Sequence, residues 1–374
     1  MSEAFRFCVR RDDPAVTSLQ PDPDAPAQRT LAVGEVRLRV CLFAVTANNV
    51  TCALYGDKLS FWHMFPVSGP TWGCIPGWGF GEVVESRCDR ITVGERLFGF
   101  LPMGSYLVLR PGTISAQGFF DATPERADAA PILHYFLRRG QSQQAEPMDD
   151  RLFALLYPLF GVGYLLADYV ATGGATGSGP LLITAASSKT AACAAFCLRR
   201  ALPAADLWGL TSPSHLDFVK SLGCYDRVMA YGQASVGLRR EEVTLIDVAG
   251  DARLRDALHQ HYGDRLRRSI SVGRAHWAEF KPPHASLPGP RPKQFWAPHY
   301  GSVRVSSAPG GLSSEQYNAG LYRAWRDFVS AVLCRPHHPP FEAVTLSGPG
   351  GIAVAWAALL DGSAEPHEGF VVQV

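Results

Sequence analysis

The sequence predicts an α/β protein in which a β-rich N-terminal part precedes a doubly wound parallel sheet. Short strand-like runs separated by glycine and proline fill the chain to about residue 115. Strand-like and helix-like segments then alternate from about residue 180 to residue 273, which is typical of parallel βαβ units. A length of 374 residues is enough for two domains.

The N-terminal strands are apolar runs bounded by turn residues. Residues 36–45 (VRLRVCLFAV) first alternate apolar and polar side chains and then become continuously apolar. Residues 79–86, 95–101 and 106–111 are further strand-like runs. We expect them to form a compact β-rich domain over residues 1–150.

The pattern changes after residue 150. Residues 152–171 are long enough for a helix, although Pro158 and two glycines interrupt them. Alternating segments follow, with strands expected at 179–185, 205–211, 226–231, 242–250 and 265–273, and helices at 190–202, 214–223 and 252–263. This order predicts a doubly wound sheet within residues 151–335.

The last quarter of the chain is less regular. Residues 280–312 are rich in proline and glycine, and we expect a long loop near a site there. Residues 314–334 and 351–362 are expected to be helical, and residues 369–374 to be a strand. We expect residues 336–374 to return to the first domain.

Charge and cysteine content exclude several classes of protein. Thirty-five basic residues nearly balance 34 acidic ones, and no basic run occurs, so we expect no nucleic-acid partner. The nine cysteines include no CxxC pair and are interpreted as reduced thiols of a cytoplasmic protein. The N-terminus has no apolar signal segment, and the apolar stretches are too short or too interrupted for a bilayer span. No membrane partner is therefore expected.

A candidate phosphate loop follows the strand LLIT. The chain continues as AASSKTA (residues 185–191) into a helix, without the glycines of GxGxxG. Ser187, Ser188 and Thr190 are small and can cap the helix or donate to phosphate. Lys189 adds positive charge where the helix dipole already favours an anion. The alternative is an ordinary capped turn with a solvated lysine.

The end of the second strand bears on the choice of nucleotide. An NAD site usually has an acidic residue there, which bonds the ribose 2′-hydroxyl. This chain has Thr211 and Ser212 instead, so NADP is favoured over NAD. Tyr231 after the third strand, and Ala249 and Gly250 after the fourth, would complete the rim of the site.

Several stretches resemble a known protein family. The chain is similar to the medium-chain dehydrogenase/reductase superfamily, in its zinc-free, quinone oxidoreductase-like part, and more closely to a bacterial and fungal branch known as a domain of unknown function. The matching stretches are TANNVTCALYGD, IPGWGFGEVVES, VGERLFGFLPM, LLITAASSKTA, GLTSPSHLDFVKSLGCYDRVMAY, DVAGD, SVGRAHW and FWAPHYGSVR.

The resemblance implies a GroES-like domain followed by a Rossmann domain, NADP(H) bound in a cleft between them, and a homodimer. It implies no zinc, because Trp78, Gly79 and Phe80 occupy the turn where zinc-dependent members have a His-Glu pair. The chain departs from the family pattern at Cys52, where tyrosine is expected, and at His215, where asparagine is expected.

The catalytic candidates follow from the same resemblance. Asn48 or Asn49 would orient the nicotinamide ribose or the substrate carbonyl, and Tyr55 would donate a proton or hydrogen bond. The alternative is an asparagine-capped turn with Tyr55 in the core. Tyr135, with His134 and Arg138 close to it in sequence, is a further donor candidate or part of a packed helix surface.

The strand end at residue 273 is expected beside the nicotinamide. There the backbone of Gly273 would bind the carboxamide, and Arg274 or His276 would reach phosphate or substrate. Aromatic residues at 61–65 with Trp72 and Trp78 would form an apolar pocket or a core cluster.

Two functions remain open. The first is a zinc-independent, NADP(H)-dependent oxidoreductase that transfers hydride to an apolar ketone, enone or enoyl thioester. The second is a non-catalytic nucleotide-binding or scaffold protein of the same fold.

Overall fold

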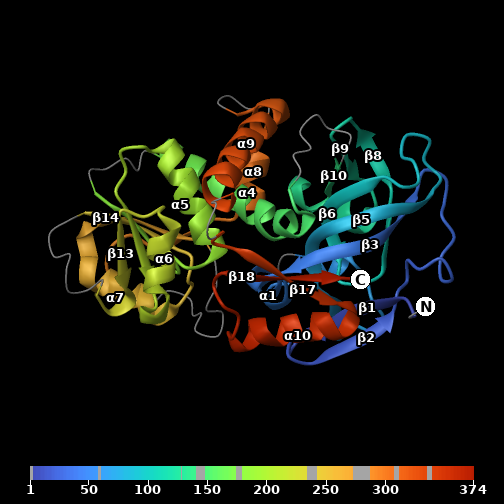
Figure 1. Ribbon diagram of the computed structural model, residues 1–374, viewed down its shortest axis with the longest axis horizontal. Coiled ribbons are helices and arrows are strands. Elements are labelled where there is room, and N and C mark those ends of the chain that lie inside the picture. The colour runs from blue at the N-terminus through green and yellow to red at the C-terminus, as the bar shows by residue number, and fades with distance from the viewer. Residues whose placement is uncertain are drawn as a thin grey trace. The chain divides into compact units, whose positions relative to one another are not determined.

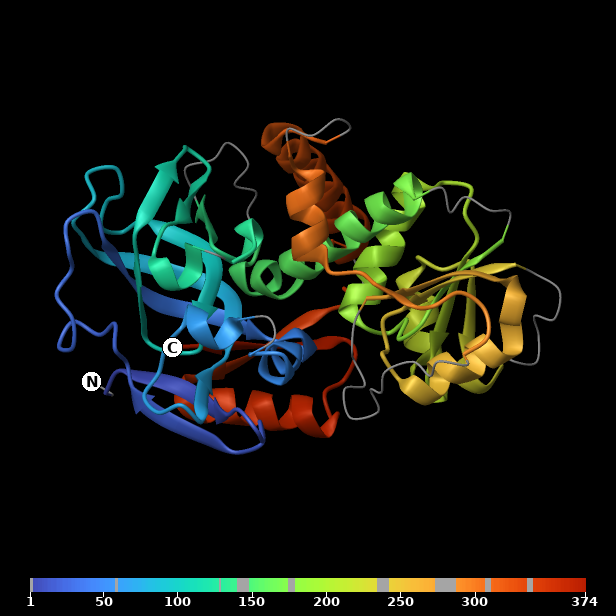
Figure 2. The same ribbon diagram turned by 180° about the vertical axis from the view of Figure 1, so that it is seen from behind.

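A computed structural model describes residues 3–57, 60–127, 129–139, 148–173, 179–233, 242–272, 287–306, 311–334 and 339–374. The chain divides into two compact units. Unit 1 contains Met1–Leu156 and Glu342–Val374, and unit 2 contains Tyr157–Phe341. Figures 1 and 2 show unit 1 in blue to green with a red C-terminal part, and unit 2 in green to orange.

Unit 1 is built on two β-sheets. A three-stranded sheet has the order β2-β1-β4, and a nine-stranded sheet has the order β17-β18-β3-β5-β6-β10-β9-β8, with β7 also paired to β3. The strands are β1 Phe5–Arg10, β2 Thr17–Pro21, β3 Val36–Val45, β4 Trp72–Cys74, β5 Pro76–Ser86, β6 Arg96–Pro102, β7 Tyr106–Leu109, β8 Pro111–Ile114, β9 Gly118–Asp121, β10 Tyr135–Arg139, β17 Glu342–Ser347 and β18 Glu368–Gln373.

Strand β3 is central because three strands pair with it. β5 lies along one edge, while β7 and β18 share the other, β7 beside Val36–Arg39 and β18 beside Leu42–Val45. The C-terminal strand therefore pairs with β3 of the first part of the chain. Close approach of β5 requires Gly79, since a Cβ there would lie 2.1 Å from Leu42 O.

The helices of unit 1 are short except for one near the C-terminus. They are α1 Ala47–Leu54, α2 Phe61–Met64, α3 Pro124–Ala127, the 3₁₀ turn η1 Pro131–Leu133 and α10 Gly348–Asp361. Helix α10 is tied to the N-terminal segment by Trp356, whose Nε1 donates to Pro14 O at 2.8 Å. Helix α1 follows β3 directly and carries the candidate residues Asn48 and Asn49.

Unit 2 is a parallel sheet with the order β13-β12-β11-β14-β15-β16. Counted along the chain this order is 3-2-1-4-5-6, the doubly wound arrangement that the sequence predicts. The strands are β11 Leu181–Ile183, β12 Leu207–Thr211, β13 Arg227–Ala230, β14 Val243–Asp247, β15 Leu266–Ser271 and β16 Lys293–Gln294.

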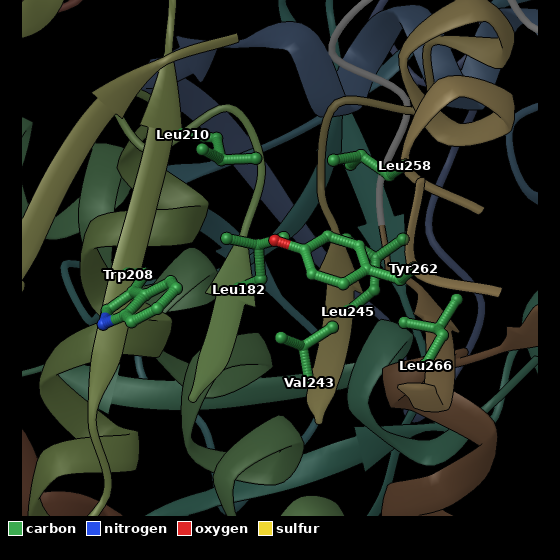
Figure 3. Close-up of a cluster of buried hydrophobic side chains, with 8 residues drawn as sticks. All are labelled: Leu182, Trp208, Leu210, Val243, Leu245, Leu258, Tyr262 and Leu266. Atoms are coloured by element: carbon green, nitrogen blue, oxygen red, sulfur yellow. The ribbon is translucent and has the colours of Figure 1, made fainter. Parts of the chain in front are cut away.

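Helices in unit 2 connect these strands. They are α4 Asp150–Thr172 (which begins in unit 1), α5 Lys189–Ala201, α6 Leu216–Leu222, α7 Ala252–Tyr262, α8 Ala297–Arg304 and α9 Ser314–Phe328, with 3₁₀ turns η2 Pro213–His215, η3 Tyr231–Gln233 and η4 Gly263–Arg265 and the π-helix η6 Val329–Leu333. Helix α7 covers one face of the sheet, where Leu258 and Tyr262 pack with Leu182 and Leu245. Figure 3 shows the Tyr262 ring pointing from α7 toward Leu182.

Helix α4 is continuous, although Pro158 and two glycines were expected to interrupt it. Pro158 lies inside the helix, and buried apolar residues on both sides, such as Leu156 and Phe160, compensate for the missing amide. By length and composition α4 could cross a membrane, which corrects the expectation that the apolar stretches are too short or too interrupted for a bilayer span. However, 61% of its most apolar window is buried in the structure, as in the core helix of a globular protein.

Part of the proline-rich stretch 280–312 is helical rather than a loop. Helix α8 is anchored to α4 by Asp168, which accepts from Tyr300 Oη at 2.6 Å and from Arg304 Nε at 2.7 Å. These partners lie more than a hundred residues from Asp168 in sequence. Local composition could therefore not predict the helix.

Candidate functional site

The strand order of unit 2 places a candidate site between β11 and β14. The winding direction reverses there, so the connections leaving the carboxyl ends of these strands diverge and leave room for a ligand. The segments that follow the two strands are Thr184–Ser188 and Val248–Asp251.

A buried hydrogen-bond network joins these two segments. Thr184 Oγ1 donates to Asp247 Oδ1 at 2.8 Å and accepts from the amides of Val248 and Ala249 at 2.9 and 3.0 Å. Asp247 Oδ1 also accepts from Gly250 N at 3.1 Å. Burial raises the pKa of Asp247, while the Thr184 hydrogen bond lowers it. The network fixes the ends of both strands. Sequence reasoning placed the turn that begins at Asp247 on the rim of the site, but it did not single out Thr184.

The loop after β11 bends as a glycine loop would. Ala185 has φ +49°, the left-handed region that glycine usually supplies. The next residue, Ala186, is held in place because Tyr225 Oη donates a hydrogen bond to its carbonyl at 3.1 Å. Gly209 of β12 completes the packing, since a Cβ there would lie 3.0 Å from Ala186 Cβ. The missing GxGxxG glycines are thus compensated by neighbouring contacts.

The predicted cap of the following helix is present. Ser188 is the N-cap of α5, and its Oγ accepts from Ala191 N at 3.2 Å. Lys189 and Thr190 are the first two residues of the helix. Lys189 Nζ lies 5.6 Å from the centre of the Phe341 ring. Positive charge therefore lies at the helix end that already favours anions.

The end of β12 carries hydroxyl groups and no acid. Thr211 is fully buried, and its Oγ1 has no hydrogen-bond partner among the residues that the structure describes. Ser212 Oγ lies 3.1 Å from Ser214 Oγ. His215 Nδ1 lies 3.3 Å from Ser187 Oγ, so this rim touches the loop after β11.

Tyr231 reaches from the end of β13 to the same loop. Burial raises the pKa of its phenol to about 12, although the nearby backbone of Ala185 lowers it. The amides of Ala249 and Gly250 are used by Thr184 and Asp247. The structure thus places Ser187–Thr190, Thr211, Ser212, Tyr231, Ala249 and Gly250 at neighbouring strand ends. Gly273 and His276 lie outside the described residues.

In unit 1 the side chain of Asn49 caps α1. Its Oδ1 accepts from Thr46 N at 2.5 Å, and its Nδ2 donates to Pro76 O at 2.6 Å. Asn49 is 2% exposed, so both ends of the buried amide are occupied by the protein itself. This is the capped turn that the sequence left open as the alternative.

Asn48 and Tyr55 remain the more accessible members of the group. Both are half-buried, Asn48 in the first turn of α1 and Tyr55 at its C-cap. Cys52, between them, is buried, and burial raises the pKa of its thiol to about 12. Cys52 is therefore no nucleophile.

Tyr135 is placed apart from α1. It lies on β10, and β5 and β6 separate that strand from β3, which leads into α1. Its ring centre is 4.8 Å from that of Phe120, and burial raises its pKa. Asn48, Asn49 and Tyr55 are thus grouped together, and Tyr135 is not grouped with them.

The aromatic segment forms part of the core of unit 1. Phe61 and Phe65 are buried and pack against Phe100 with ring centres 6.1 and 6.5 Å apart. Half-buried Trp78 lies 4.9 Å from Phe100. This arrangement matches the core-cluster alternative for Phe61 and Phe65.

One group of possible metal ligands occurs among the described residues. Ligand atoms of Glu342, His367 and Glu368, on or beside β17 and β18, lie within 4.8 Å of one another. Glu342 is exposed and the other two are half-buried, which is also common for groups that bind no metal.

Comparison with known proteins decides the family. A family model described as "Protein of unknown function (DUF2855)" matches residues 43–365, most of the chain. The chain belongs to this family. No curated protein matches it.

Solved structures show that the DUF2855 protein shares its fold with known reductases. The CurK enoyl reductase is 15% identical, with a TM-score of 0.59, covering 100% of this chain and 99% of that one. CurA in complex with NADPH from Vibrio vulnificus is 14% identical, with a TM-score of 0.60, covering 96% and 94%. A quinone oxidoreductase from Coxiella burnetii is 13% identical, with a TM-score of 0.58, covering 100% of both chains.

These likenesses agree with the two sheets described above. The DUF2855 protein has the medium-chain dehydrogenase/reductase fold, with a GroES-like β-rich part and a Rossmann parallel sheet. The resemblance inferred from the sequence is confirmed for both family and fold.

Proposed function

We propose that this DUF2855 protein is a zinc-independent, NADP(H)-dependent oxidoreductase that transfers hydride to an apolar ketone, enone or enoyl thioester. The single observation that carries the proposal is the strand-end arrangement of unit 2. A capped helix with a lysine at its first position follows β11, and a rim without carboxylates follows β12. This combination suits a phosphorylated dinucleotide.

The residues present fit the adenosine part of such a ligand. Thr211 Oγ1 is a buried polar atom without a described protein partner, and such atoms usually bond a ligand or water. Ala185 has the left-handed backbone of a phosphate-loop glycine. Ser187, Ser188 and Thr190 would hold the pyrophosphate, Lys189 would lie near the 2′-phosphate, and Ser212 and Tyr231 would border the adenosine.

Charge favours NADP over NAD. No Asp or Glu occurs from Leu207 to Leu216, so nothing in this segment would repel a 2′-phosphate or hold a 2′-hydroxyl as an acid does. The NADPH complex of CurA, a protein with the same fold, supports this choice.

The chemistry would be shared between cofactor and chain. NADP(H), when bound, would supply or accept the hydride. Asn48 and Tyr55 would orient the substrate and donate a hydrogen bond to its carbonyl oxygen, which takes up negative charge during reduction. Tyr135 lies on a separate part of the sheet and would not act together with Asn48 and Tyr55. Asn49 would act through α1, by holding Asn48 in place.

A turnover assay tests the proposal. The purified protein is mixed with NADPH and, in parallel, NADH, with a panel of apolar enones, ketones and enoyl thioesters, and nucleotide absorbance is followed. We expect NADPH oxidation with at least one acceptor and slower oxidation of NADH. Absence of NADPH binding would contradict the proposal.

One observation favours the second candidate, a nucleotide-binding or scaffold protein without turnover: Asn49 is fully used in capping α1. NADPH binding without oxidation across the whole panel would support this candidate.

A further inference from the structure

Proposed NADPH binding gives one residue at the rim of β12 a specific role. His215 is the last residue of η2, four residues beyond the end of β12. In a 3-2-1-4-5-6 sheet the adenosine ribose lies at the end of the second strand, here β12. His215 Nδ1 also lies 3.3 Å from Ser187 Oγ in the phosphate loop. One imidazole therefore contacts the loop expected to hold the pyrophosphate and borders the place of the ribose.

We propose that His215 is a specificity-determining residue that binds the 2′-phosphate of NADPH as an imidazolium and makes NADPH affinity depend on pH. This inference rests on the proposed function.

Few charged groups lie on the described elements beside His215. In the loop its neighbour is the uncharged Ser187. In the first turn of α5 the charged group is Lys189, which lies over the Phe341 ring. On α6 the charged groups are Asp217 and Lys220, which pair with each other at 3.2 Å, with the Asp217 side chain 98% exposed.

Phe218 of α6 packs against the same Phe341 ring, with ring centres 6.1 Å apart. This contact places α6 beside Lys189 at the start of α5. Ser212 and Ser214, the other polar side chains of the turn, bear no charge. A 2′-phosphate at this rim would therefore meet the ammonium group of Lys189 and the imidazole of His215.

Proton binding and phosphate binding then reinforce each other. Histidine changes its charge between about pH 5 and pH 8, and a phosphomonoester carries close to two negative charges at neutral pH. Since the charged imidazole binds the phosphate better than the neutral one, NADPH should bind more tightly as the pH falls. NADH lacks the 2′-phosphate, so its affinity should not follow His215.

The test is a set of binding titrations. Dissociation constants of NADPH and NADH are measured by tryptophan fluorescence at several values between about pH 6 and pH 8, for the wild-type protein, His215→Asn, His215→Lys and the control His299→Asn. His299 is an exposed histidine on α8 of the same unit. The 2′-phosphate itself gains a proton near pH ~6, so variants are compared with wild type at each pH.

We expect the ratio of NADPH affinity between wild type and His215→Asn to rise about fivefold to tenfold from the alkaline to the acid end, as one added charge contact permits. His215→Lys should keep tight NADPH binding at the alkaline end, and His299→Asn should match wild type. An identical pH profile for wild type and His215→Asn would overturn the role of His215 while leaving the proposed function intact. Failure of both nucleotides to bind would overturn both.

Discussion

Thr184 Oγ1 donates a 2.8 Å hydrogen bond to Asp247 Oδ1, joining the ends of β11 and β14. These strands flank the point at which the sheet reverses its winding. Because Thr184 also accepts from two amides after β14, one hydroxyl fixes both segments that border the candidate site. The preorganisation of the site therefore depends on this buried contact.

Replacement of Thr184 by valine should destabilise unit 2 and weaken NADPH binding. The change removes a donor from buried Asp247 and an acceptor from two buried amides, and we expect a loss of about 2–3 kcal/mol in the free energy of unfolding. Thr184→Ser keeps the hydroxyl and serves as the control. Urea denaturation measures both; equal stability of the valine and serine variants would refute the role of the hydroxyl.

Alanine substitutions at two glycines of α4 should change the stability of the protein in opposite directions. A Cβ on Gly163 would lie 2.8 Å from Ala194 N of α5, whereas a Cβ on Gly161 would meet nothing within 4 Å. We expect Gly163→Ala to cost about 1–3 kcal/mol through overpacking. Gly161→Ala should stabilise by up to ~1 kcal/mol through helix propensity. Thermal unfolding distinguishes them, and similar effects would show that α4 and α5 do not pack this closely.

Stability should fall in mild acid because of His259. This buried residue faces Pro288 O at 2.8 Å and Ser269 Oγ at 2.9 Å, and burial lowers its pKa. The unfolded chain therefore takes up the proton first as pH falls, so the stabilising contribution is complete above about pH 7 and declines through about pH 6 and below.

The measurement for His259 is the free energy of unfolding against pH for wild type and His259→Gln. The glutamine variant should lack this part of the acid dependence, whatever its stability at neutral pH. Parallel curves would show that His259 does not contribute to the acid response.

Lys189 should contribute to nucleotide affinity. We expect Lys189→Ala to weaken NADPH binding about tenfold, as for a lost charge-assisted hydrogen bond, and NADH binding less. Lys220→Ala is the matched control, because Lys220 is exposed and paired with Asp217. Calorimetric titration measures both. Equal weakening of NADPH and NADH binding would show that Lys189 contacts the pyrophosphate. Unchanged binding of both nucleotides would show that Lys189 lies outside the site.

Alanine substitutions at the two adjacent asparagines should separate an effect on stability from an effect on catalysis. Asn49→Ala removes the cap of α1 and the bond to Pro76 O, and should cost about 1–2 kcal/mol of stability. Asn48→Ala should change stability by less than about 0.5 kcal/mol and lower kcat of NADPH oxidation. The reverse assignment, with Asn49→Ala stable and inactive, would return the catalytic role to Asn49.

Local sequence patterns predicted much of unit 2. Strand β14 and helix α7 are recognisable because an apolar run is followed by a polar helix that ends at Gly263. The cap at Ser188 was also predictable, since a hydroxyl residue directly precedes the helix. Such features depend on neighbours in sequence.

The features that the sequence did not predict depend on distant partners. Helix α8 is held by Asp168 from α4, and β17 is half-exposed and pairs with a strand more than twenty residues away. The role of Thr184 depends on Asp247, and the second hydrogen bond of Asn49 reaches the distant Pro76 O. None of these contacts leaves a local motif in the chain.

The most direct test of the account is a crystal structure of the protein soaked with NADPH. We predict density for the adenosine at the carboxyl ends of β11 and β12, its pyrophosphate at the N-terminus of α5 and its 2′-phosphate beside Lys189 and His215. Crystals soaked at saturating NADPH that show no nucleotide there would contradict it.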